Sequence, residues 1–200
     1  MILLYVLVLV ALAVSGIRPF DRATWVMEVA PIFVAFPLMG VTRTRFRLTT
    51  LLYLLIALHA LVLIAGGAYT YARVPAGFWV QQWFDLDRNP YDKLGHFAQG
   101  FVPAMVAREI FIRRDVIKGS RWLGFVIVCV VLAVSATYEL IEWGAALTLG
   151  QGAEEFLGTQ GDVWDTQSDM FMALLGAGAA LLSLTRLHDG QLGAVGPLGR

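Results

Sequence analysis

Residues 122–147 read WLGFVIVCVVLAVSATYELIEWGAAL, and this stretch decides the fold class. Its first seventeen residues carry no charge, and the stretch exceeds the ~20 apolar residues that a helix needs to cross a bilayer. The whole chain has a similar character, since 58% of its 200 residues are hydrophobic and only 15% are charged. A soluble domain could not cover so much apolar surface with polar groups, so the sequence predicts an all-α membrane protein.

About six apolar runs tile the chain, each long enough or nearly so for a membrane-spanning helix. They cover residues 1–17, 24–41, 48–71, 93–112, 122–147 and 163–184. We therefore predict one polytopic helical bundle over residues 1–186, followed by a flexible tail over residues 187–200. The first run lacks the basic start of a secretory signal, so we expect it to be retained, although residues 13–16 resemble a cleavage region.

Basic residues gather in two connecting segments, and their distribution predicts the orientation. Three Arg lie at 43–47 and four Lys or Arg at 113–121, whereas residues 148–162 contain neither. Because cytoplasmic loops carry the excess of Lys and Arg, both termini are expected in the cytoplasm. The outer side then holds an aromatic segment at 78–84, expected to be a short amphipathic helix that anchors or covers the site, and a glycine-punctuated acidic loop at 150–161.

Polar side chains gather near the outer ends of the predicted spans, where a bilayer disfavours them. Spacings of three and four residues along 92–99, 139–142 and 162–169 place members on one face of each helix. The set comprises Glu28, Asp92, Lys93, His96, Gln99, Glu139, Glu142, Gln160, Asp162, Asp165, Gln167 and Asp169. An acid at the bilayer centre costs ~3 kcal/mol on insertion scales, so these groups should face one another or a water-filled cavity.

Carboxylates that point inward together repel, so the set must hold protons, meet cationic partners or bind a cation. A divalent cation would satisfy it, since Mg and Mn take oxygen ligands and a histidine admits Zn or Fe. The predicted metal ligands are His96, Glu139, Glu142, Asp165 and Asp169. A proton-linked polar network and a structural network are the alternatives.

Three further polar residues are expected to have ordinary structural roles. Arg108 and Glu109 approach the cytoplasmic end of their run, where long side chains reach the interface. His59 is alone in an apolar run and is expected to make one interhelical hydrogen bond.

Three motifs carry a family resemblance. They read YDKLGHF at 91–97, YELIEW at 138–143 and QGDVWDTQSDM at 160–170. These segments resemble the YjdF-like bacterial inner-membrane proteins over most of the chain, which implies a multi-pass protein of the inner membrane but no particular reaction. The Asp-Lys-x-x-His-Phe opening is also distantly similar to the VanZ-like family, some members of which are linked to glycopeptide resistance. That family typically has a Glu and a Gln in the middle motif, where this chain has Glu139 and Glu142.

Net charge and sequence motifs limit the classes of function that the protein can have. A formal net charge of +0 argues against nucleic-acid binding. No nucleophile elbow, phosphate loop or His-Glu-x-x-His pair occurs, which leaves open whether the protein is an enzyme. The leading hypothesis is a metal-binding protein that binds or acts on an envelope lipid or lipid-linked precursor, with Glu139 or Asp162 as the candidate base. A proton- or cation-coupled transporter and a non-enzymatic membrane scaffold are the alternatives.

Overall fold

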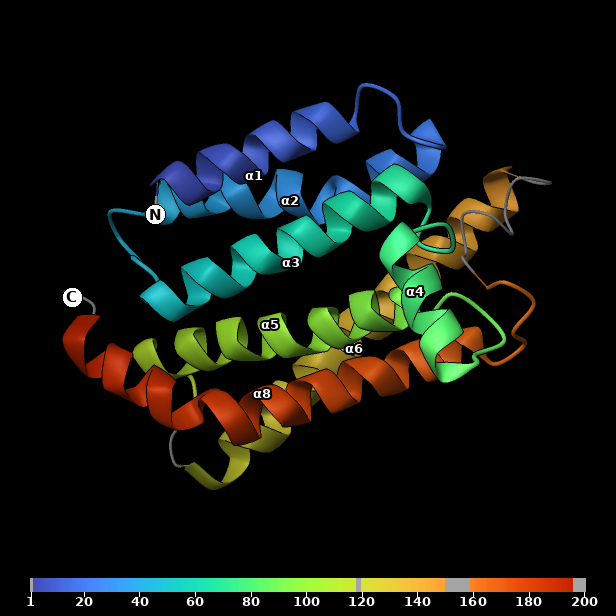
Figure 1. The fold of residues 1–200 in the computed structure, drawn as a ribbon. Coiled ribbons are helices and arrows are strands. Elements are labelled where there is room, and N and C mark those ends of the chain that lie inside the picture. Colours follow the sequence, from blue (N-terminus) through green and yellow to red (C-terminus); the bar gives the residue numbers. More distant parts are fainter. Residues whose placement is uncertain (1, 118–119, 150–158, 196–200) are drawn as a thin grey trace.

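The computed structural model describes residues 2–117, 120–149 and 159–195, and within these ranges the chain forms helices and turns without strands (Figure 1). The helices are α1 (Ile2–Ser15), α2 (Arg22–Thr42), α3 (Thr50–Tyr69), α4 (Pro75–Phe84), α5 (Tyr91–Arg113), α6 (Ser120–Leu149) and α8 (Asp165–Val195). The predicted all-α class is confirmed.

Four of these helices, α2, α3, α6 and α8, are long and apolar enough to cross a membrane. Helix α1 has 14 residues, and α5 has 23 residues but carries charges near both ends. Most charged residues of α5 are buried against neighbouring helices. The outer surface of α5 is therefore more apolar than its overall composition suggests. The described residues thus form a polytopic bundle, while the count of about six spans stays a prediction.

Six of the described helices, all except α4, form two units of three. One unit packs α1, α2 and α3 around an apolar core that includes Val29 and Ala60. The other packs α5, α6 and α8, together with the start of α3, around Met105, Ile127 and Ala177. Figure 1 shows the units as two layers, and contacts between α3 and α5 join them. A cavity between the two layers would therefore be lined by helices of both units.

Helices α5 and α8 approach each other closely because two glycines lie at their crossing. A Cβ atom on Gly100 would overlap the carbonyl oxygen of Ala173, and one on Gly176 would overlap the carbonyl oxygen of Phe97. Backbones can come this near only where no side chain intervenes. This contact sets the register in which the polar start of α5 faces the polar start of α8.

Local capping explains where two helices begin. The Asp21 carboxylate accepts the Thr24 amide at 2.7 Å and caps α2, and this backbone hydrogen bond lowers the pKa of Asp21. Thr49 caps α3 in the same way through the amide of Leu52. The aromatic segment predicted to be a short helix is one: α4 is helical, and its Trp79 and Trp83 side chains are exposed.

The C-terminal region differs from the sequence expectation. Residues 187–195, predicted to begin a flexible tail, continue α8, and residues 196–200 lie outside the described ranges. Tertiary contacts hold this last part of the helix: His188 and Asp189 bind side chains of α5, and the Gln191 side chain accepts the Leu51 amide at 2.8 Å. These contacts outweigh the low helix propensity of Gly190 and Gly193.

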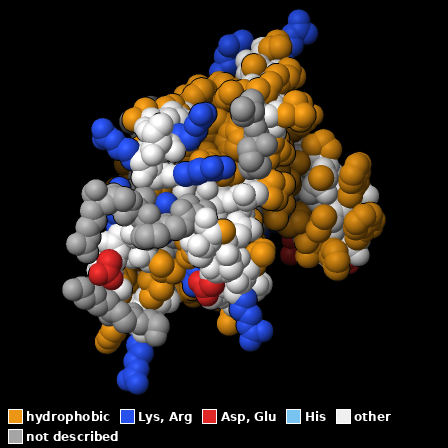
Figure 2. Space-filling view, turned by 90° about the vertical axis from the view of Figure 1, so that its left-hand side faces the viewer, with side chains coloured by type: hydrophobic (Ala, Val, Ile, Leu, Met, Phe, Trp, Pro, Cys, Tyr) orange, Lys and Arg blue, Asp and Glu red, His pale blue; other side chains and the backbone are white. Residues whose placement is uncertain are grey.

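Helix α1 begins and α8 ends at the same end of the bundle (Figure 1). Figure 2 views this end and shows many Lys and Arg side chains but few Asp and Glu. The chain supplies Arg43, Arg45 and Arg47 after α2 and Arg113 and Arg114 at the end of α5. A basic end face is typical of the cytoplasmic side, although the orientation itself stays a prediction.

Candidate functional site

Buried charged side chains meet at the opposite end of the bundle. Helices α2, α5 and α8 begin at this end and α6 ends there (Figure 1). The acidic and histidine residues buried here are Glu28, Asp92, His96, Glu139, Glu142, Asp165 and Asp169. The fold therefore brings together polar residues from four helices that are distant in sequence.

His96 lies between carboxylates. Its Nε2 atom is 3.5 Å from Oδ1 of Asp92 and 3.7 Å from Oδ2 of Asp169. Its other ring nitrogen, Nδ1, lies 3.1 Å from Oε1 of Gln99 on the next turn of α5. A carbonyl oxygen only accepts, so in the neutral ring this contact assigns the proton to Nδ1 and leaves a lone pair on Nε2. Asp92, His96 and Asp169 thus offer three ligand atoms within 4.8 Å of one another.

Two basic residues neutralise the acids at the start of α8. Lys93 Nζ donates to Oδ1 of Asp165 at 2.8 Å and to Oδ1 of Asp169 at 2.6 Å. Arg88 lies 2.7 Å from the same oxygen of Asp165 and donates to Asp162 at 3.0 Å. Burial disfavours the charge of Arg88, but its bond to Asp165 outweighs this effect and raises the pKa of the guanidinium.

The other carboxylates of the cluster are less completely paired. Oδ2 of Asp92 and Oε1 of Glu139 are buried without a hydrogen-bond partner. Glu28 accepts a hydrogen bond from the Tyr138 hydroxyl at 3.2 Å, and the Tyr71 hydroxyl also interacts with it. Glu142 is buried, and no described residue forms a hydrogen bond or ion pair with it. Buried carboxylates in this state need protons or a bound cation.

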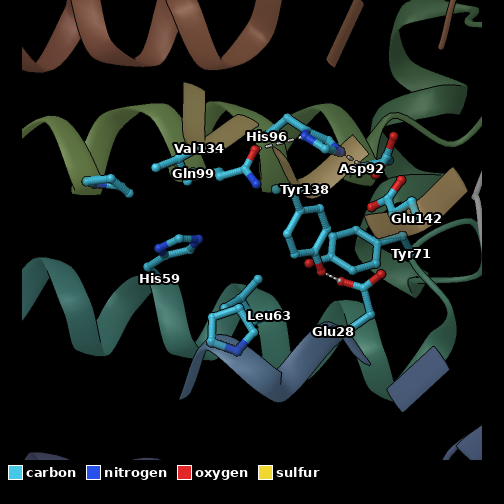
Figure 3. A pocket seen from close by; sticks show the side chains of 13 residues that line it. Glu28, His59, Leu63, Tyr71, Asp92, His96, Gln99, Val134, Tyr138 and Glu142 are labelled. Atoms are coloured by element: carbon cyan, nitrogen blue, oxygen red, sulfur yellow. Dashed lines mark hydrogen bonds and ion pairs between the residues drawn. The ribbon is translucent and has the colours of Figure 1, made fainter. Parts of the chain in front are cut away.

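A cavity of about 140 Å³ lies beside His96, between α2, α3, α5 and α6 (Figure 3). Glu28 and Glu142 line one side, and His59 reaches the cavity from α3 on the other. Apolar side chains such as Leu63 complete the wall. His59 Nε2 is buried and has no hydrogen-bond partner, so the predicted interhelical hydrogen bond is not made by this atom.

The predicted metal ligands are only partly together. His96 and Asp169 belong to the close group, and Asp92, predicted as a neighbouring polar residue, completes it. Asp165 is instead turned toward the two basic residues. Glu139 Oε1 lies 3.8 Å from His96 Nδ1, at the other ring nitrogen from the close group.

The remaining predicted residues lie around this centre at different depths. Glu142 lines the cavity. Asp162 accepts the Trp164 amide at 2.9 Å, and Gln160 exchanges hydrogen bonds with the backbone of Asn89. Gln167 is exposed on α8. Residues 150–158 of the predicted acidic loop lie outside the described ranges.

Sequence reasoning missed Arg88 and Tyr138 as members of the site. Arg88 lies in a turn where the sequence predicts only a change of direction, so no span pattern drew attention to it. Tyr138 reads as an interface aromatic residue, yet it lies one helical turn before Glu142 and therefore shares its face of α6. That spacing was the available signal.

A second buried network lies at the other end of α5. Glu109 is fully buried and accepts hydrogen bonds from Thr49 Oγ1 at 2.7 Å, from Arg113 at 2.8 Å and from His188 Nε2 at 3.0 Å. Arg108 lies 2.8 Å from His188 Nδ1. The expectation that Arg108 and Glu109 extend to the interface is therefore wrong, because the continued α8 supplies His188 as a buried partner. The network ties α3, α5 and α8 together, although Nε of Arg113 is buried without a hydrogen-bond partner.

Apolar helices around a buried carboxylate and histidine cluster define a polytopic membrane protein with an internal polar site. The chain belongs to the family described as "Predicted membrane protein (DUF2238)", whose model matches residues 1–190. It is 58% identical over 178 residues to "Inner membrane protein YjdF" of Escherichia coli (strain K12), which covers 89% of this chain and 85% of that protein. No solved structure matches the chain.

The YjdF-like resemblance and the inner-membrane location are thus confirmed. As an integral membrane protein, the chain contacts membrane lipids. The more distant likeness to the VanZ-like family stays a prediction.

Proposed function

We propose that this inner-membrane protein holds a divalent metal ion between Asp92, His96 and Asp169 and uses it to bind or act on an envelope lipid or lipid-linked substrate. The observation that carries the proposal is the arrangement of His96, whose Nε2 faces two carboxylate oxygens at 3.5 and 3.7 Å. In a tetrahedral zinc site with bonds of about 2.0–2.2 Å, ligand atoms lie about 3.4 Å apart. A small closure of the three side chains would therefore complete three coordination bonds.

The surroundings of His96 support a metal ligand. Metal-binding histidines usually give their second ring N–H to an acceptor that fixes the ring, and Gln99 occupies this position at 3.1 Å. Lys93 holds Oδ1 of Asp169, so Oδ2 can serve the metal without breaking that ion pair. One imidazole nitrogen and two carboxylate oxygens suit Zn, Mn or Fe, and Mg less well.

Glu139 is the better candidate for a catalytic base if the site is an enzyme. Its Oε1 is buried, has no hydrogen bond and lies 3.8 Å from His96. Asp162, the other candidate, is occupied by Arg88 and by the amide of Trp164. Because Oε1 lies beside Nδ1 and not beside the close group, Glu139 would act as general base in a hydrolase or transferase only through an intervening water.

A lipid substrate is supported by where the site lies. Helix α4 borders the same end of the bundle, and its exposed Trp79, Trp83 and Phe84 suit the headgroup layer of a bilayer (Figure 1). The surface of the cavity beside His96 is largely apolar, and Leu63, Pro103 and Val134 are among its lining residues. An amphiphile whose headgroup approaches the metal fits both features.

Cation- or proton-coupled transport is the second candidate, favoured by His59, which carries polar lining toward the middle of α3. It ranks lower because Ala104 and Met105 are fully buried and follow the cavity along α5 before the Glu109 network begins. This apolar segment separates the two polar regions.

Metal content of the detergent-purified protein tests the proposal. Plasma mass spectrometry should find about one metal ion per chain in the wild type, and Asp169→Asn should lose it while remaining monodisperse. Asp87→Asn, an exposed acid outside the cluster, is the matched control and should keep the metal. Absence of metal from the wild type after reconstitution with Zn and Mn, or equal content in Asp169→Asn, would reject the metal site and favour a proton-linked or scaffold role.

A further inference from the structure

The cavity beside His96 contains carboxylates that the metal site does not use. The group able to hold a metal comprises Asp92, His96 and Asp169, whereas Glu28 and Glu142 line the adjoining cavity from α2 and α6. In Figure 3 both carboxylates lie on the same side of the cavity, near the Tyr71 and Tyr138 rings. This arrangement is a second potential site, built on helices other than α8.

Among the described residues that line the cavity, three are carboxylates and none is Lys or Arg. Glu142 is only 9% exposed, and the structure gives it no hydrogen bond or ion pair among the described residues. Glu28 is 6% exposed and has the Tyr138 hydroxyl as a partner. The bases of the cluster, Arg88 and Lys93, are bound to acids of α8. A cationic occupant would therefore supply what Glu142 lacks.

The size and lining of the cavity favour an organic cation over a bare ion. An apolar cavity of roughly 150 Å³ admits a molecule the size of benzene, and this cavity measures about 140 Å³. Tyr71 and Tyr138 present aromatic rings, which attract cations, and Leu63 and Val134 present apolar surface to an alkyl chain.

The far side of the cavity offers a polar contact. His59 Nε2 is buried, lacks a hydrogen-bond partner and belongs to a side chain that faces the cavity. A buried ring nitrogen without a partner is costly, so an occupant with a hydroxyl or similar group at this position would relieve that cost.

From these observations we infer that the cavity binds a small primary ammonium compound. Its ammonium group pairs with Glu142 near Glu28, its short carbon chain crosses the apolar middle, and a polar end meets His59. Two sources share this chemistry: a free amine and the headgroup of an aminophospholipid. The inference differs from the metal proposal in the residues that hold the ligand, which belong to α2, α3 and α6, although Asp92 and His96 of the metal group also line the cavity.

Calorimetric titration of detergent-purified protein tests the inference. The probes are ethanolamine, 4-aminobutanol and butylamine as free amines, and dihexanoyl-phosphatidylethanolamine as the lipid, with dihexanoyl-phosphatidylglycerol as the lipid without an amine. Binding of the free amines identifies a soluble ligand, and binding of the ethanolamine lipid alone identifies a headgroup site. Failure of every amine-bearing probe at millimolar concentration overturns the inference.

Two variants locate the bound molecule. Glu142→Gln keeps the shape of the side chain and should weaken amine binding about tenfold or more, because it removes one partner of a buried charge pair. His59→Leu should abolish the preference for 4-aminobutanol over butylamine while leaving butylamine bound. Unchanged affinity in Glu142→Gln, shown to be folded by its gel-filtration profile, contradicts the inference.

Asp169→Asn separates this inference from the metal proposal. It should lose the metal and still bind the amine, since Asp169 does not line the cavity. Amine binding that disappears with the metal would show that no independent site exists. If the wild-type protein holds the metal but binds no amine, the metal proposal stands and the amine site is rejected.

Discussion

Replacing Gly176 by alanine should loosen the contact that positions the site. The added Cβ would lie 2.9 Å from the backbone nitrogen of Phe101 and would overlap the carbonyl oxygen of Phe97, both on α5. Ordinary contacts begin at 3.4 Å, and the overlap with the Phe97 oxygen is the larger of the two, so α8 must move away from α5 by about one ångström. Overpacking of this kind costs about 1–3 kcal/mol. For a chain of this length, that corresponds to a fall in melting temperature of about 2–12 °C.

Gly178 provides a matched control on the same helix. A Cβ there meets nothing within 4 Å, and alanine is about 1 kcal/mol more favourable than glycine inside a helix. Gly178→Ala should therefore melt at or above the wild-type temperature. Thermal unfolding in detergent, followed by circular dichroism, measures both variants. The reasoning is refuted if Gly176→Ala melts with the wild type, or if both variants fall equally.

Two other perturbations test the second network and the cap of α2. Glu109→Gln should lower stability by about 3 kcal/mol in denaturant titration, because it leaves buried basic partners without their counter-charge, while metal content stays unchanged; the exposed Asp189→Asn should cost much less. Asp21→Ala should cost about 1 kcal/mol through the lost cap. The Thr24 amide lowers the pKa of Asp21, so the contribution of this cap is complete above the unfolded value of about 3.9 and is lost as the pH falls through the lower folded-state value. The stability gap between wild type and Asp21→Ala should therefore narrow at acid pH, and a constant gap would contradict the assignment.

The sequence predicted the helices well where apolar length decides the outcome. A helix needs about 20 apolar residues to cross a bilayer, and residues 122–147 were long and apolar enough to predict one. The structure places them in α6. The ionisable residues within the predicted spans also indicated that His96 and Asp169 would lie together. A bilayer disfavours such residues unless they face one another or a polar cavity.

The pairing within the site could not be read from the sequence. Asp165 and Asp169 lie on neighbouring turns, and which of them meets His96 depends on how α8 sits against α5. That register is set by Gly100 and Gly176, whose role appears only once the two backbones are in contact. The same limit applies to His188. The glycines at 190 and 193 predicted a flexible tail there, whereas contacts with α5 and α3 keep the segment helical.

The most direct test of the metal site is an anomalous difference map from crystals of the protein grown with zinc. A single strong peak about 2.0–2.1 Å from His96 Nε2, shared with carboxylate oxygens of Asp92 and Asp169, is the predicted result. It should vanish in Asp169→Asn crystals. A map without a peak at His96, while zinc occupies other positions, would contradict the account.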